Sequence, residues 1–112
     1  PVVLVEGVFD AVKVYNSIPI LGSTLNTESE LFQKLIRARR PVYVALDNDA
    51  QKKEERIIKN LLLHGVEVHK MEVPRNHDLG DLTKEECAQI KQKANFVENI
   101  DYLLYQKILG GI

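Results

Sequence analysis

The sequence predicts an α/β fold: an open, mostly parallel four-stranded sheet with helices on both faces, similar in plan to the Rossmann type. Short apolar runs alternate with longer segments whose apolar residues recur every three or four positions, and this alternation is typical of parallel sheets with helical crossovers. Two of the runs are apolar throughout, as expected of strands covered on both faces. Because parallel strands end at one edge of a sheet, polar residues that follow them are expected to share a site.

The first half of the chain contains three of the four expected strands. We expect strands at residues 2–5, 18–22 and 42–46, and helices at residues 8–15 and 28–40. Thr27 and Glu30 stand three residues apart, which is the pattern of a capping box at the start of the second helix. Pro19 favours the edge of the sheet for its strand. If that strand lies outside the first one, the first and third strands are neighbours, and the switch point falls between Glu6 and Asp47.

The second half is expected to add one strand and three helices. These are a helix at residues 51–64, a strand at residues 66–71, and helices at residues 83–94 and 97–109. Gly65 suits the end of the first of these helices, and Thr83 with Glu86 forms a second capping box. The polar face of the helix at residues 51–64 is expected to be solvated, and it comprises Lys52, Lys53, Glu54, Glu55, Arg56 and Lys59.

Composition restricts the class of protein. A chain of 112 residues has room for one core, and its net charge of −1 gives no global attraction to nucleic acid. Cys87 is the sole cysteine, so no disulfide framework is expected, in keeping with a cytoplasmic protein. No apolar run approaches the roughly 20 residues of a membrane span. The chain opens on strand residues without Met, and we expect it to be part of a longer protein.

Acidic residues follow two of the apolar runs. Glu6 comes directly after the first run, and Asp47 and Asp49 come directly after the third. If both runs are parallel strands, the three carboxylates emerge at the same edge of the sheet. Neighbouring carboxylates repel each other unless a cation lies between them, and hard oxygen ligands suit Mg²⁺. The sequence therefore predicts a divalent-cation site at this edge.

Three segments together resemble the toprim domain that bacterial and phage DNA primases share with topoisomerases and some nucleases. Residues 5–11, Val-Glu-Gly-Val-Phe-Asp-Ala, match the E-G-x-x-D-A segment of that family, and residues 46–49, Leu-Asp-Asn-Asp, match its D-x-D. Residues 77–81, His-Asp-Leu-Gly-Asp, match the acidic loop after the fourth strand. The resemblance is greatest to primases, phage primases in particular. It implies a catalytic core at residues 1–82, with residues 83–112 as a C-terminal helical extension of the same domain.

The resemblance also implies roles for individual residues. Glu6 is expected to be catalytic, in proton transfer or as a metal ligand. Metal ligation is expected from Asp47, Asp49, Glu6 and Asp78. A supporting position around the metal, or a phosphate contact, is expected of Asp10, Gly7, Asp81, Lys52 and Lys53. The expected cofactor is Mg²⁺ or Mn²⁺.

The function that follows is metal-dependent nucleotidyl transfer, in which a DNA primase synthesises RNA primers on single-stranded DNA. The expected partners are the template strand and nucleoside triphosphates, held through flanking domains, and a replicative helicase; no membrane is involved. Little activity is expected of the isolated domain. One alternative is a toprim nuclease, of the overcoming-lysogenisation type or a related ribonuclease. Another is a non-catalytic α/β module whose acids bind Mg²⁺ only to organise a surface.

Simpler structural explanations exist for several of these residues. Asp47 or Asp49 could cap the helix that follows, and Asp10 could be an acid stabilised in a first helical turn. Lys52 and Lys53 could belong to a solvated helix face whose charge is balanced by neighbouring glutamates. The sequence shows no evident aromatic platform on which the bases of a single strand could stack.

Overall fold

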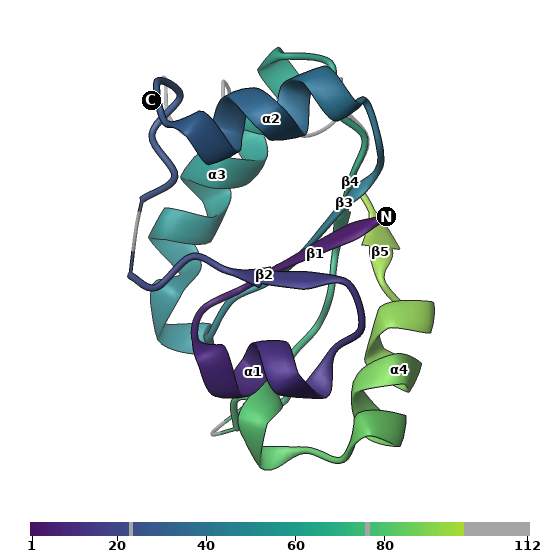
Figure 1. Cartoon of the computed structure of the whole chain (residues 1–112). Helices are drawn as coiled ribbons and strands as arrows, with labels where there is room; N and C mark the ends of the chain where they lie inside the picture. The colour runs from purple at the N-terminus through teal and green to yellow at the C-terminus, as the bar shows by residue number, and fades with distance from the viewer. Residues whose placement is uncertain (23, 76, 98–112) are drawn as a thin grey trace, which may run out of the picture.

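The computed structural model describes residues 1–22, 24–75 and 77–97, and five strands in this part of the chain form one sheet with the order β2-β1-β3-β4-β5 (Figure 1). The elements in chain order are β1 (Val2–Val5), α1 (Val8–Lys13), β2 (Ser17–Pro19), α2 (Glu30–Ala38), β3 (Val42–Ala45), η1 (Asn48–Ala50), α3 (Gln51–Leu63), β4 (Val68–Lys70), η2 (Leu79–Asp81), α4 (Lys84–Gln92) and β5 (Asn95–Phe96). The predicted α/β fold with a mostly parallel sheet is confirmed.

The first four strands are parallel, and β1 lies between β2 and β3. Val2 pairs with Val42 and Val5 with Ala45, so the first and third strands end side by side, as the sequence predicts. The strand that contains Pro19 is at the edge of the sheet, where a missing N–H is tolerated.

β5 is the one strand in the described part of the sheet that the sequence does not predict. It runs antiparallel to β4, with His69 opposite Phe96 and Lys70 opposite Asn95. Two residues are too few to show a strand periodicity, which is why this edge strand escapes prediction. Most of the last predicted helix, at residues 97–109, lies outside the described residues.

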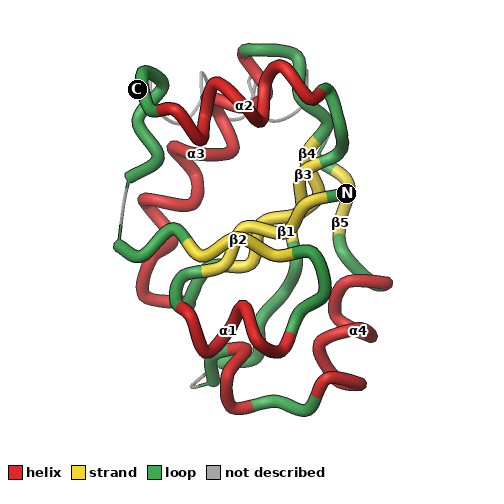
Figure 2. The backbone as a smooth tube through the Cα atoms, viewed as in Figure 1, coloured by secondary structure: helices red, strands yellow, loops and turns green. Residues whose placement is uncertain are grey.

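Helices cover both faces of the sheet, as Figure 2 shows. Under α2 and α3 lies a core of Leu4, Ile20, Leu25, Phe32, Leu35, Val42, Val44, Leu46, Ile57, Ile58, Leu61, Leu62, Val66 and Val68. Under α1, η2 and α4 lies a smaller core of Val3, Val5, Val14, Ala45, Met71, Val73, Leu79, Leu82 and Cys87. Alternate residues of β1 enter opposite cores, which explains why this strand is apolar throughout. None of the helices in the described part of the chain is long and apolar enough to cross a membrane.

The helix ends confirm two of the predicted signals and correct a third. Thr83 and Glu86 form the expected capping box, and Gly65 follows α3 with a φ of 80°, a conformation that favours glycine. The Thr27 capping box is wrong, because Ser29 is the N-cap and its hydroxyl accepts a hydrogen bond from the Phe32 N–H at 3.2 Å.

The polar face of α3 differs from the prediction at Glu54. This residue was expected to be solvated, but it is only 5% exposed. One carboxylate oxygen accepts a hydrogen bond from the Leu46 N–H at 3.0 Å, and the other lies 3.5 Å from the Lys70 ammonium. Burial raises the pKa of Glu54, while the Leu46 hydrogen bond and Lys70 lower it in part. A helical periodicity counts polar residues as solvated and so misses a buried carboxylate with partners of its own.

Candidate metal centre

Three aspartates from separate segments converge beside the carboxyl ends of the central strands. Asp47 follows β3, Asp10 lies in the first turn of α1, and Asp78 is the N-cap of η2. One carboxylate oxygen of each lies within 4.8 Å of one from each of the others. We call Asp10, Asp47 and Asp78 the acidic triad. Parallel pairing of β1 with β3 produces it, because α1 and Asp47 then follow strands that end at the same place.

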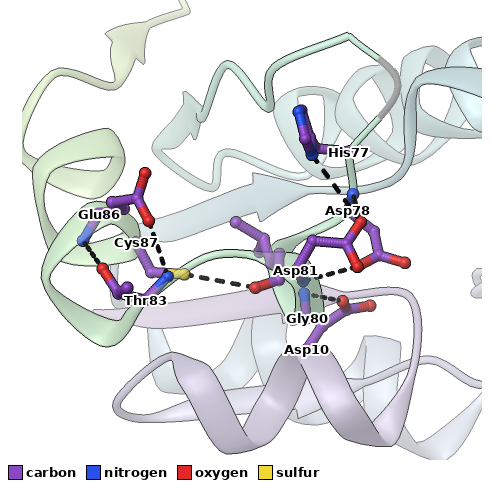
Figure 3. A network of polar contacts seen from close by, with 9 residues as sticks. Asp10, His77, Asp78, Gly80, Asp81, Thr83, Glu86 and Cys87 are labelled. Atoms are coloured by element: carbon purple, nitrogen blue, oxygen red, sulfur yellow. Dashed lines mark hydrogen bonds and ion pairs between the residues drawn. The ribbon is translucent and has the colours of Figure 1, made fainter.

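Asp10 is fixed by backbone donors from two segments. One of its oxygens accepts a hydrogen bond from the Gly7 N–H at 3.0 Å and the other from the Gly80 N–H at 2.8 Å, the second of which is drawn in Figure 3. The side chain is 6% exposed. Asp10 therefore ties the start of α1 to the acidic loop, and this contact determines how closely Asp78 approaches the strand ends.

The acidic loop is held by a reciprocal pair of hydrogen bonds. The Asp81 N–H donates to Asp78 at 3.1 Å, and the Asp78 N–H donates to Asp81 at 3.2 Å (Figure 3). A Cβ atom at Gly80 would lie 3.1 Å from an Asp78 oxygen and 3.4 Å from an Asp10 oxygen. A side chain at this position would require Asp78 to move by a few tenths of an ångström, and glycine allows the close approach without that movement. Asp81 supports the loop, and its side chain is 57% exposed.

Glu6 lies next to these groups but is paired with a cation. Its Oε1 atom lies 2.7 Å from the Lys53 ammonium, and both side chains are largely buried. Its Oε2 atom is the one side-chain oxygen or nitrogen in the described part of the chain that is buried without a hydrogen-bond partner. An unpaired buried carboxylate oxygen is unfavourable unless a ligand or proton completes it. Lys53 therefore pairs with one oxygen of Glu6 and leaves the other without a partner.

The electrostatics are most unfavourable at Asp47. Desolvation is the largest cause that raises the pKa of its carboxyl group, to about 6, and the charges of Asp10, Asp78, Glu6 and Asp49 raise it further. Asp47 stands at the N-cap position of η1, but its side chain accepts no capping hydrogen bond there. The capping explanation for Asp47 therefore lacks the hydrogen bond it requires.

Glu54 stabilises the end of β3, the strand that Asp47 follows. Its hydrogen bond to the Leu46 N–H fixes the peptide between Ala45 and Leu46, at the end of β3. The sequence gives no signal for this role beyond the position of a glutamate one turn into α3. Among the other predicted site residues, Asp49 and Lys52 are exposed, and Asp49 lies outside the acidic triad.

Comparisons with known proteins bear mainly on the fold. No protein-family model matches the chain, and no curated protein matches it. Among solved structures, the chain is similar to the crystal structure of the Aquifex aeolicus primase, comprising its zinc-binding and RNA polymerase domains, with a TM-score of 0.69 and 25% sequence identity. The likeness covers 86% of this chain and 26% of that chain. The chain thus has a primase-like fold and spans about a quarter of the length of the primase that it matches.

Proposed function

We propose that the chain is a toprim domain that carries the metal-dependent nucleotidyl-transfer site of a DNA primase. The observation that carries this proposal is the acidic triad, which assembles from three separate segments at the carboxyl edge of a primase-like fold. The motif segments that resemble toprim sequences supply all three of its members. The template strand and nucleoside triphosphates are the proposed substrates.

The donor set fits a divalent cation. Oxygen ligands around an octahedral Mg²⁺ lie about 2.1 Å from the ion, and hence roughly 3–4 Å from one another. The triad oxygens lie within 4.8 Å of one another, so a small adjustment brings them into that range. The unpaired Oε2 atom of Glu6 is a further group that a ligand or proton would complete. When bound, Mg²⁺ or Mn²⁺ supplies positive charge that holds nucleotide phosphates and stabilises charge at the reacting phosphorus.

In the proposed reaction, the residues of the site would have separate roles. Asp47 and Asp78 would present oxygens to a bound ion, while Asp10 holds both the start of α1 and the acidic loop in register through its two backbone hydrogen bonds. The Oε2 atom of Glu6 would accept the proton of the attacking 3′-hydroxyl group, and the ion pair with Lys53 would hold the Glu6 side chain in place for that task. Asp49 stays a predicted metal ligand that is exposed and lies outside the acidic triad.

Calorimetric titration of Mn²⁺ into the chain tests the proposal. Asp47→Asn and Asp78→Asn should each weaken binding by tenfold or more, whereas Glu85→Gln, which removes an exposed charge on α4, should leave it unchanged. Equal affinity in all four proteins would place the ion elsewhere and refute the site.

Activity distinguishes primase from nuclease. If the chain is fused to the zinc-binding domain of a bacterial primase, it should synthesise primers in Mg²⁺, and Glu6→Gln should abolish synthesis. Metal-dependent nicking of DNA by the chain alone, lost in Glu6→Gln, would instead assign it to the nucleases.

A further inference from the structure

A groove lies beside the C-terminal end of α1. It has a volume of about 780 Å³ and runs between the second half of α1 and the length of α4, with Tyr43 of β3 at its floor. Its lining includes Lys13, Tyr15, Tyr43, Lys84 and Lys91. The triad member Asp10 lies in the first turn of α1, so groove and triad occupy different ends of this helix.

The groove is positively charged within a chain that has a net charge of −1. Lys13, Lys84 and Lys91 line it, and no acidic residue does. Every ion pair found among the described residues involves other cations. Three lysines that pair with no carboxylate of the described residues surround one concavity, and together they attract an anion.

Aromatic side chains continue from the floor of the groove across the sheet. The Tyr43 and His69 rings are stacked with centroids 4.5 Å apart, and the Phe96 ring lies 5.3 Å from His69. Parallel and antiparallel pairing place these three residues in one row across β3, β4 and β5. Lys91 extends over the Tyr43 ring, with its ammonium 5.4 Å from the ring centroid.

Two aromatic side chains are open to solvent: Phe96, at the end of this row, and Tyr15, in the lining of the groove. Phe96 is 51% exposed at the edge of the sheet, and Tyr15 is 90% exposed at the rim of the groove. The row of Tyr43, His69 and Phe96 cannot be recognised in the sequence, because the three residues are far apart along the chain and are aligned only when β5 pairs with β4. Bases of any sequence can stack on such rings.

We infer that this groove binds single-stranded nucleic acid, with Lys13, Lys84 and Lys91 contacting phosphates and the exposed aromatic rings contacting bases. Lys84 and Lys91 are two helical turns apart, about 10 Å along α4, which suits separate phosphates along a strand better than the phosphates of one nucleotide. The inference deepens the proposed function by assigning a surface of this chain to the template strand, which the sequence had left to flanking domains.

The test is a salt titration of the binding of a fluorescent oligothymidine to the chain, in EDTA so that the metal site has no part. For a single strand, the slope of log K against log salt is about −0.7 per phosphate contact. The triple variant Lys13→Gln, Lys84→Gln and Lys91→Gln should therefore lose about two units of slope. Tyr15→Ala should weaken binding about tenfold without changing the slope.

The matched control removes three exposed cations from the helices on the other face of the sheet. Lys34→Gln, Arg37→Gln and Lys59→Gln changes the net charge equally, and it should keep the wild-type slope. Equal slopes for the groove and control variants would overturn the inference. Full displacement of the oligothymidine by a mononucleotide at equal affinity would also overturn it, in favour of a nucleotide pocket.

These experiments test the proposed metal site and the proposed nucleic-acid groove independently. If Mn²⁺ titration refutes the acidic triad while the groove variant still loses its slope, the nucleic-acid surface stands and the catalytic proposal falls. Loss of folding in the groove variant is checked by its melting temperature, and each single Lys→Gln change should then show about one third of the effect.

Discussion

Replacing Asp47 by Asn should stabilise the metal-free protein at neutral pH. Asp47 is a carboxylate that desolvation and four neighbouring acids disfavour in its ionised form. Asn keeps the shape and the capacity to accept hydrogen bonds but carries no charge. The change therefore isolates the electrostatic strain at the strand end from any packing effect.

The magnitude follows from the pKa of Asp47. A rise from 3.8 to about 6 corresponds to about 3 kcal/mol at 1.36 kcal/mol per unit, and solvent screening of this partly exposed side chain reduces it to about 1–2 kcal/mol. The folded protein binds the proton more tightly than the unfolded chain does. Wild-type stability from this group is therefore fully present below pH 4 and is lost as the pH rises through 6.

The assay is urea unfolding in EDTA at pH 4.5 and at pH 7.5. Asp47→Asn should be about 1–2 kcal/mol more stable than wild type at pH 7.5, with a much smaller difference at pH 4.5. Asp49→Asn, an exposed acid on the following turn, should change stability by less than about 0.5 kcal/mol. A variant that is less stable than wild type at pH 7.5, or a difference that does not depend on pH, would refute the reasoning.

Three further predictions concern the groups around the triad. Glu54→Ala leaves the Leu46 N–H unsatisfied and should lower the free energy of unfolding by about 2–3 kcal/mol, whereas Glu54→Gln should recover most of the loss in the same urea titration. Gly80→Ala forces a methyl group against Asp78 and Asp10 and should weaken Mn²⁺ binding at least tenfold by calorimetry; unchanged affinity would show that the loop position is irrelevant. Mn²⁺ affinity should fall as the pH is lowered through 6, because the ion competes with the proton on Asp47, and a flat profile between pH 5 and 8 would contradict this competition.

The sequence predicts the parallel part of the sheet because its strands coincide with short apolar runs between helical segments. An uninterrupted apolar run such as residues 42–45 has few interpretations once helices flank it. The two-residue strand β5 has no period to detect, so its position depends on tertiary pairing with β4. Glu54 fails for a related reason: its burial depends on a hydrogen bond to a strand end that lies eight residues away, which a helical wheel cannot represent.

For the acidic residues of the site, the sequence predicts the edge of the sheet at which they lie but not which of their carboxylates come into contact. The strand ends place Asp47 at the correct edge, and the motif marks Asp10 and Asp78 as residues of interest. Which oxygens lie within 4.8 Å of one another depends on the path of the acidic loop, and that path is fixed by the Gly80 N–H on Asp10. A contact between residues 70 positions apart leaves no trace in local spacing.

The central claim is that the acidic triad holds a divalent cation, and an anomalous difference map from crystals of the chain grown with Mn²⁺ tests it most directly. The account predicts a peak between the carboxylates of Asp10, Asp47 and Asp78, at distances of about 2.1–2.3 Å from the oxygens that bind it, and no such peak in crystals of Asp47→Asn. A map with no peak at the triad, or with its main peak at another group of acids, would contradict the account.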